Sequence, residues 1–445
     1  MTDSNSALLT HRRVWALAGP IIISNISVPL VGAVDTAVVG HLPEPDSIGA
    51  VALGALIFTF LFWGFGFLRM GTTGFIARAY GANDHQALSD TLLRVLLLAV
   101  VLGAAIILLS YPLINFALYL LESSDRIESL ASSYAGIRIW SAPATLSIYV
   151  FTGVFIGLHN MRNVFVLQLV MNIANVLLDF LFVLGFDMGV EGVALATLIA
   201  EYLAACLGLW LLRAPLAAAY RQLNWKRLLE RSAILALMKA NGDIFIRTLC
   251  LVFSFGYFTA KSATMGEVIL AGNSILLHMQ SILAYALDGF AHAAEALVGS
   301  AYGAGKQREF KRAVKLTTIW GLVTAVVISL IYWIFGSVIL QLFTSIDSVL
   351  LSATTYLPWT IIAPLVSIWS FQLDGIFIGT GFTREMRNAM VISMLTYLAL
   401  LALLIPAWGN HGLFLALSLF MVIRAITLGY YYPNILKAMP SEKSD

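Results

Sequence analysis

Long apolar segments alternate with short polar ones along the whole chain. Each apolar segment is long enough for a helix across the roughly 30 Å of hydrocarbon in a bilayer, where backbone polar groups must bond within the segment. The pattern predicts an all-α integral membrane protein. Twelve helices are expected, over 15–39, 48–72, 91–118, 131–157, 164–186 and 190–212 in the first half and over 235–260, 268–292, 311–343, 353–380, 388–408 and 411–433 in the second.

The two halves of the chain repeat the same short motifs at a spacing of 221 to 225 residues. The repeated pairs are Ala79-Tyr80-Gly81-Ala82 with Ala301-Tyr302-Gly303-Ala304, Ala142-Pro143 with Ala363-Pro364, Ile156-Gly157 with Ile378-Gly379, and Met161-Arg162-Asn163 with Met386-Arg387-Asn388. Six helices per copy return the chain to the same side, so a pseudo-two-fold axis along the membrane normal should relate two six-helix bundles. We expect a substrate to bind in a cleft between these bundles.

Basic and acidic residues alternate between successive loops, which predicts the orientation. Loops on one side carry arginine and lysine, and those on the other carry acids, so both termini are expected in the cytoplasm. The predicted domains are a cytoplasmic tail (1–14), a first lobe with the ion-coupling site (15–212), a cytoplasmic linker (213–232), a second lobe (233–433) and a cytoplasmic tail (434–445). The linker holds five basic residues, namely Arg213, Arg221, Lys226, Arg227 and Arg231.

Composition agrees with a membrane protein and excludes several function classes. Hydrophobic residues make up 60% of the chain and charged residues 11%, whereas soluble domains carry about a quarter charged residues. The polar segment Met1–Thr10 gives no sign of a removed signal peptide. Both cysteines, Cys206 and Cys250, lie in apolar runs and are expected to be buried thiols. No Walker A loop or HExxH helix occurs, so we expect no enzyme, no cofactor and no bound metal.

Acidic side chains inside the first lobe are the strongest candidates for function. Asp35 lies in the first helix and Asp179 in the fifth, each near the outer end. Asn175 and Asn172 precede Asp179 by four and seven positions, so all three share one helical face. Thr197 and Glu201 on the sixth helix reach similar depth, roughly 8–15 Å below the outer surface. The second copy has Tyr257 and Leu404 opposite the two aspartates, so the scaffold is symmetric apart from its buried charge.

A carboxylate at membrane depth costs about 2.5–3.5 kcal/mol or more. Burial and a second nearby carboxylate both favour its neutral form, so such a group can carry a proton. The same oxygens, together with Asn175 and Thr197, could instead hold a sodium ion. The alternative without a transport role is hydrogen bonding between helices, which amides and hydroxyls provide more cheaply than two aspartates.

Other residues are candidates for movement and for substrate contact. Pro29 precedes Asp35 by six residues and Pro20 lies nearer the cytoplasm, so either could act as a hinge, or be a static kink. Aromatic residues including Phe62 and Tyr257 could line a cleft for organic cations, although most such residues face lipid or core. In the second half, Asp288 and Asp374 could neutralise a cationic substrate or pair with a base such as Arg247. Arg69 and Arg424 are expected to snorkel from helix ends.

Several motifs together resemble a known family. They are Pro29 with Val34-Asp35-Thr36-Ala37-Val38-Val39-Gly40-His41-Leu42, Ala79-Tyr80-Gly81-Ala82, Asn172 through Asn175 to Asp179, Gly192-Val193-Ala194-Leu195-Ala196-Thr197 into Glu201, Tyr285-Ala286-Leu287-Asp288-Gly289-Phe290, and Leu373-Asp374-Gly375-Ile376-Phe377-Ile378-Gly379. Over essentially its whole length the chain resembles the multidrug and toxic compound extrusion (MATE) family, in particular its DinF-type branch.

The resemblance implies a V-shaped pair of six-helix lobes that exports organic cations and other drugs against a proton or sodium gradient. Asp35, Asn175, Asp179 and Thr197 match the ion-site positions in the first lobe of that branch. Asp374 matches an acid used by the sodium-coupled NorM-type branch. The seventh helix, however, has no glutamate between Thr248 and Tyr257, which favours protons in the first lobe.

We therefore expect a monomeric antiporter in the inner membrane of a bacterium. It would export amphipathic, mostly cationic drugs in exchange for protons, with Asp35 and Asp179 as the titrating groups and with membrane lipid, but no nucleic acid, as a further partner. The alternatives are a sodium-coupled exporter that uses the same site and a flippase for lipid-linked substrates. A channel is disfavoured because pores repeat their charges in rings.

Overall fold

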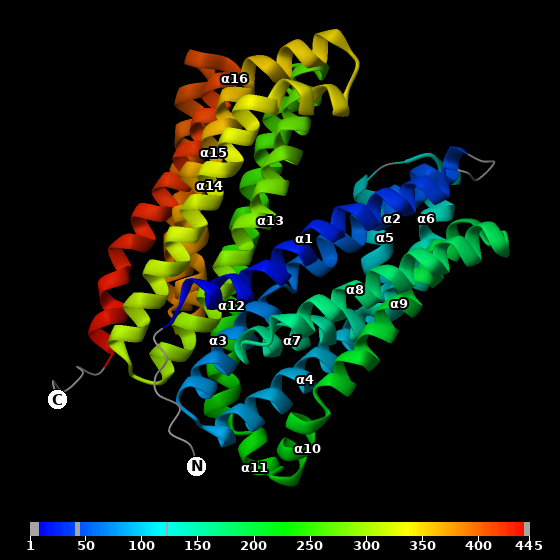
Figure 1. Cartoon of the computed structure of the whole chain (residues 1–445). Helices are drawn as coiled ribbons and strands as arrows, with labels where there is room; N and C mark the ends of the chain where they lie inside the picture. Colours follow the sequence, from blue (N-terminus) through cyan, green and yellow to red (C-terminus); the bar gives the residue numbers. More distant parts are fainter. Residues whose placement is uncertain (1–8, 41–44, 122, 440–445) are drawn as a thin grey trace. The chain divides into compact units, whose positions relative to one another are not determined.

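The protein is almost entirely helical in the computed structural model, which describes residues 9–40, 45–121 and 123–439 (Figure 1). In α1 the description covers the whole backbone and all side chains except those of residues 28–31, 33, 35 and 36. Within the described residues there is no strand, and ten helical stretches are long and apolar enough to cross a membrane. The predicted all-α membrane fold is confirmed.

Helices of the first half follow the predicted segments, but several of these are divided. Their bounds are α1 (His11–Val39), α2 (Pro45–Gly64), α3 (Phe67–Gly81), α4 (His85–Leu108), α5 (Ser110–Leu121), α6 (Asp125–Arg138), the 3₁₀ turn η1 (Ile139–Ser141), α7 (Ala142–Gly157), α8 (Met161–Asp179), the π-helical turn η2 (Phe180–Gly185) and α9 (Gly189–Leu211). The 3₁₀ turn η1 separates α6 from α7, whose first turn contains Pro143. The first turn of a helix tolerates proline, because its backbone nitrogen needs no partner within the helix there.

Two short helices occupy the predicted polar linker, namely α10 (Arg213–Arg221) and α11 (Trp225–Leu228). The helices that follow the linker are α12 (Arg231–Ala263), α13 (Glu267–Gly303), α14 (Gln307–Phe343), α15 (Asp347–Thr380) and α16 (Thr383–Ala438). α16 consists of two helices that meet at Gly409, where φ is 55° and ψ is −130°. Only glycine adopts such a backbone without strain, and the two parts correspond to the last two predicted helices.

The chain divides into two compact units. The first-half unit contains Ile23–Ile76 and Asp84–Leu237, and the second-half unit contains Met238–Asp445 together with Met1–Ile22 and Ala77–Asn83. The start of α1 and the end of α3 thus pack with the second half of the chain. The predicted division into lobes at 15–212 and 233–433 does not include this exchange.

Close contacts to α13 hold both exchanged segments in the second-half unit. A Cβ added to Gly289 would lie 2.4 Å from Cγ1 of Ile22 on α1, and the Trp15 and Phe290 rings meet edge to face at 5.3 Å. The end of α3 crosses α13 through the repeated motifs. A Cβ on Gly81 would lie 1.9 Å from the Ser300 carbonyl oxygen, and a Cβ on Gly303 would lie 2.1 Å from that of Arg78.

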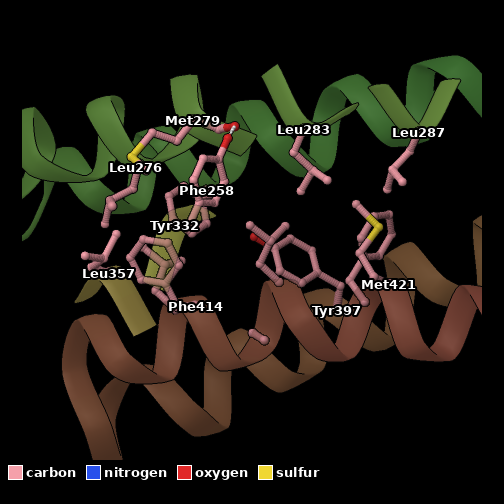
Figure 2. Close-up of a cluster of buried hydrophobic side chains, with 14 of the residues drawn as sticks. Phe258, Leu276, Met279, Leu283, Leu287, Tyr332, Leu357, Tyr397, Phe414 and Met421 are labelled. Carbon is pink, nitrogen blue, oxygen red and sulfur yellow. Dashed lines mark hydrogen bonds between the residues drawn. The ribbon is translucent and has the colours of Figure 1, made fainter. Parts of the chain in front are cut away.

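The core of the second-half unit is a continuous apolar cluster between α12, α13, α14, α15 and α16 (Figure 2). Leu276, Met279 and Leu287 of α13 are fully buried and face Tyr397 and other residues of α16. Beside the break at Gly409, the amides of Asn273 and Asn410 exchange hydrogen bonds of 2.7 and 2.9 Å. The reciprocal amide pair satisfies polar groups that would otherwise be costly to bury.

The reciprocal crossing of the two repeated motifs gives a test of the fold. We expect Gly81→Ala to lower the free energy of unfolding by about 1–3 kcal/mol, because the new methyl group overlaps the α13 backbone. The matched control is Gly256→Ala in α12, where no atom lies within 4 Å of the added Cβ. The control should be neutral or slightly stabilising. Melting in detergent measures both, and a Gly81→Ala protein that melts at or above wild type would contradict the crossing.

Candidate functional site

A row of polar side chains runs along one face of α8 in the first-half unit. Gln168, Asn172, Asn175 and Asp179 are spaced by four, three and four residues, which places them on one side of the helix. Asn172 and Asn175 are buried, and Asp179 has no exposed surface. The predicted helical face therefore exists and is directed into the protein.

Asp179 is the last residue of α8, and the helix changes its geometry directly after it. The next six residues form the π-helical turn η2, in which the Phe186 N–H donates to the Leu181 carbonyl oxygen at 3.0 Å. π-helical turns within α-helices occur frequently at functional sites. The sequence pattern did not predict this turn. Because of it, the Asp179 carboxyl group lies at the boundary between α-helical and π-helical backbone.

Thr197 of α9 contacts Asn175, which lies one turn before Asp179 on the polar face of α8. Asn175 Nδ2 donates to Thr197 Oγ1 at 3.2 Å, and the Thr197 hydroxyl donates to the Val193 carbonyl oxygen at 3.0 Å. Because its own proton is bound to the backbone, the hydroxyl oxygen can accept the bond from Asn175. The structure thus brings together Asn175 and Thr197 as the sequence predicted.

A second set of hydrogen bonds connects α8 to α1. Asn172 Nδ2 donates to Ser27 Oγ at 2.7 Å, and the Ser27 hydroxyl donates to the Ser24 carbonyl oxygen at 2.6 Å. Gln168 Nε2 donates to Asn172 Oδ1 at 2.9 Å. Sequence reasoning missed Ser27 and Gln168, although Gln168 continues the polar spacing of α8. These bonds fix the segment of α1 that precedes Pro29.

The predicted residues of α1 are only partly covered by the structure. The α1 backbone is helical through Pro20, Pro29 and Asp35, but the side chains of Pro29 and Asp35 lie outside the described residues. The pairing of Asp35 with Asp179, and a hinge at Pro29 or Pro20, therefore stay predictions.

Glu201 belongs to a separate ionic network rather than to the Asn175–Thr197 group. Arg138 of α6 donates from Nη2 to Glu201 Oε1 at 2.6 Å and from Nη1 to Oε2 at 3.0 Å. Thr145 of α7 also donates to Glu201, and Arg138 donates to Ser141. Both charged side chains are only 9% exposed. Together with the bond from Thr145, this two-point ion pair connects α6, α7 and α9.

Phe62, predicted as a cleft residue, forms part of the wall around Arg138. Its ring centre lies 5.5 Å from the guanidinium carbon, and that of Phe58 lies 5.3 Å away. Phe62 is only 5% exposed. Its structural contacts are those of a buried residue that shields a charge through a cation–π interaction.

Asp374 of the second-half unit is held by two arginines. Arg247 of α12 and Arg424 of α16 both bind its Oδ2 atom. All three side chains are less than a tenth exposed. The expectation that Arg424 snorkels from a helix end is wrong, because its guanidinium is needed inside the protein to balance a buried carboxylate. The alternative that Asp374 pairs with Arg247 is confirmed.

The remaining cleft candidates lie near this charged cluster or at the edge of the core. Asp288 of α13 is partly exposed and lies close enough to Arg247 and Arg424 for an electrostatic attraction between the opposite charges. Tyr257 is partly buried, stacks on Phe253 at 5.8 Å, and lies 5.4 Å from the Lys261 ammonium group. Among the described residues, no group of three His, Cys, Asp or Glu side chains could hold a metal ion. Cys206 and Cys250 are free thiols, but only Cys250 is buried, so the expectation that both are buried is wrong for Cys206, whose side chain lies on the exposed side of α9.

Comparison with known proteins gives the same family over most of the chain. The sequence profile of the MatE family matches residues 20–181 and again 244–403, in agreement with the predicted repeat. The chain is 41% identical over 428 residues to the DNA damage-inducible protein F of Escherichia coli K12, covering 96% of this chain and 92% of that protein. It is 24% identical to a probable multidrug resistance protein NorM of Photorhabdus laumondii, covering 94% and 90%.

Solved structures show the same fold at low sequence identity. A transporter of the MOP superfamily from Pyrococcus furiosus superposes with a TM-score of 0.85 at 18% identity, covering 96% of each chain. At this identity the likeness concerns the fold alone.

The Arg138–Glu201 pair predicts a defined pattern of stabilities. We expect Glu201→Gln to lower the free energy of unfolding by about 3–5 kcal/mol, because it leaves a buried guanidinium without its counter-charge. The double variant Arg138→Leu with Glu201→Leu should recover most of that stability, since two apolar side chains remove both charges together. Melting in detergent separates the three proteins. A Glu201→Gln protein as stable as wild type would show that the pair is not formed.

Proposed function

Since the chain belongs to the MatE family of multidrug and toxin efflux transporters, we propose that it exports amphipathic, mostly cationic compounds in exchange for protons. The chain is a multi-pass membrane transporter and not an enzyme. The proposal assigns the coupling proton to Asp179, together with Asp35. Their carboxyl groups would be protonated from outside and deprotonated towards the cytoplasm.

The burial of Asp179 is the observation that carries this proposal. Its side chain has no exposed surface, and the residues that share its helix face, Asn172 and Asn175, are neutral. An ionised carboxylate in such surroundings is costly, whereas protonation removes the charge. A group whose charge depends on access to water is suited to exchange a proton when the transporter opens.

The surroundings of Asp374 in the second-half unit favour protons over sodium as the coupling ion. Asp374 matches the position of the acid in the sodium-coupled branch, but two guanidinium groups bind its Oδ2 atom. Positive charges at that place repel a further cation. α12 also offers no glutamate between Thr248 and Tyr257. Coupling is therefore proposed for the first-half unit alone.

Movement of α1 is the proposed link between protonation and release of the drug. Ser27 and Asn172 hold the segment before Pro29 against α8, so a change beyond Pro29 would bend the helix rather than displace it as a whole. The missing backbone N–H of a proline weakens a helix at that point. The energy suffices, because one charge that crosses 100 mV yields about 2.3 kcal/mol, which corresponds to a concentration ratio of roughly fifty.

The proposal also includes the cellular location and the orientation of the protein in the membrane. We place the protein as a monomer in the inner membrane of a bacterium with both termini in the cytoplasm, which accords with the basic loops and with the Escherichia coli relative.

Transport of a fluorescent cation in proteoliposomes tests the coupling ion. We expect ethidium to move against its gradient when a pH gradient alone is imposed and to stay at equilibrium when a sodium gradient alone is imposed. Transport that follows the sodium gradient would replace the proton in this proposal. Failure to move ethidium under either gradient would reject the proposed substrate class.

Substitution of the buried acid tests its role. Asp179→Asn keeps the size of the side chain and mimics the protonated form, so the protein should fold while proton-driven efflux falls to background. Asp35→Asn should behave in the same way. Asp125→Asn is the matched control, because Asp125 is exposed at the start of α6 and its substitution should leave efflux unchanged. Normal drug efflux by folded Asp179→Asn protein would refute the assignment.

A further inference from the structure

The first linker helix, α10, follows a candidate membrane span without a loop. α9 is a candidate membrane span that ends at Leu211, and α10 begins at Arg213. Leu212 ends the first helix and begins the second, and it is 1% exposed. The start of α10 therefore lies at the level where the apolar stretch of α9 ends.

The inner face of the linker is fixed to α4. Ala219 of α10 and Leu228 of α11 are buried. Arg94 of α4 donates from Nε to the Leu228 carbonyl oxygen at 3.0 Å and from Nη2 to that of Arg227 at 2.6 Å. Arg227 itself lies 4.0 Å from Asp90 and donates to the Gln222 carbonyl oxygen. The linker is therefore an ordered part of the first-half unit, with one face committed to packing.

Its outer face combines aromatic rings with positive charge. Tyr220 is 73% exposed and Trp225 63% exposed. The Arg213 guanidinium lies 4.3 Å from the ring centre of Trp210, which is also exposed. A further three basic residues are exposed and have no ion-pair partner within the described residues, namely Arg221, Lys226 and Arg231. Glu230 is the only acid between positions 213 and 231.

We propose that this linker surface, formed by Trp210, Arg213, Tyr220, Arg221, Trp225, Lys226 and Arg231, binds the phosphate headgroups of anionic phospholipids. Tryptophan and tyrosine concentrate at the level of lipid headgroups, and basic residues beside them attract anionic lipid. The basic side chains would attract the negatively charged phosphate groups. The aromatic rings would lie at the boundary between headgroups and acyl chains. Bound lipid would tether the first-half unit to the leaflet that the linker faces.

Lipid is a better match than nucleic acid because of where the aromatic residues lie. Trp210 belongs to the last turn of a membrane-spanning helix, and its ring is covered by Arg213. A binding surface that begins on a membrane span is continuous with the bilayer. The basic residues alone would suit any polyanion, so nucleic acid is the competing outcome of the test.

Spin-labelled lipids measure the association directly and require no transport. The purified full-length protein is reconstituted in phosphatidylcholine with traces of spin-labelled phosphatidylglycerol or spin-labelled phosphatidylcholine, and the fraction of immobilised label is compared. We expect wild type to prefer phosphatidylglycerol, and the preference to fall as salt screens the charges. At about 1 kcal/mol per basic residue near the surface, the loss of two charges in Arg221→Gln with Lys226→Gln should weaken binding at this site roughly thirtyfold.

The matched control removes two charges from another exposed basic segment. Lys311→Gln with Lys315→Gln on α14 should keep the preference for phosphatidylglycerol closer to wild type. Trp225→Ala should reduce the preference and Trp225→Tyr should retain it. An unchanged preference in the Arg221/Lys226 variant would overturn the proposal, as would an equal loss in the control. Binding of a labelled DNA duplex that is lost in the Arg221/Lys226 variant, without lipid preference in wild type, would assign the surface to nucleic acid instead.

Discussion

Charge inside a bilayer must be balanced by the protein itself, and this constraint organises the described structure. Glu201 is paired with Arg138, and Asp374 with Arg247 and Arg424. Removal of either partner from such a pair leaves the other charge buried and alone, which is strongly destabilising. The polar groups that share the face of α8 with Asp179 are amides. Our proposal of proton coupling rests on the complete burial of this carboxyl group, because burial makes its ionised form costly.

Symmetry and asymmetry have separate roles in this fold. Where the two copies of the repeat meet, the contact is reciprocal, with Gly81 against Ser300 and Gly303 against Arg78. The charged groups do not follow the repeat, since Asp179 corresponds to Leu404. The first half thus has a buried aspartate where the second half has a leucine, while the second half holds its principal acid in ion pairs. One scaffold used twice can in this way carry two different kinds of charged centre.

The helices, the repeat and the polar face of α8 could be predicted because each is a local pattern with a fixed period. The partners of the buried charges come from distant parts of the chain, which no local pattern predicts. Arg138 precedes Glu201 by 63 residues, and Arg424 binds Asp374 although its place near a helix end favours snorkelling. The sequence did contain a usable signal for these partners. A buried charge that stays ionised needs an opposite charge nearby, so arginines within apolar helices indicate ion pairs with the buried acids. The turn after Asp179 depends on packing against α9, and α10 and α11 are too short for a periodic pattern.

Proton release on substrate binding tests the central claim most directly. Calorimetric titration of the detergent-solubilised protein with tetraphenylphosphonium, in buffers of different ionisation enthalpy, gives the number of protons exchanged per bound cation. Wild type should release protons when the cation binds, and Asp179→Asn protein should bind the cation with reduced or no release. Binding by wild type with no net proton release at any pH would contradict the account, because the buried carboxyl group would then not be linked to the substrate.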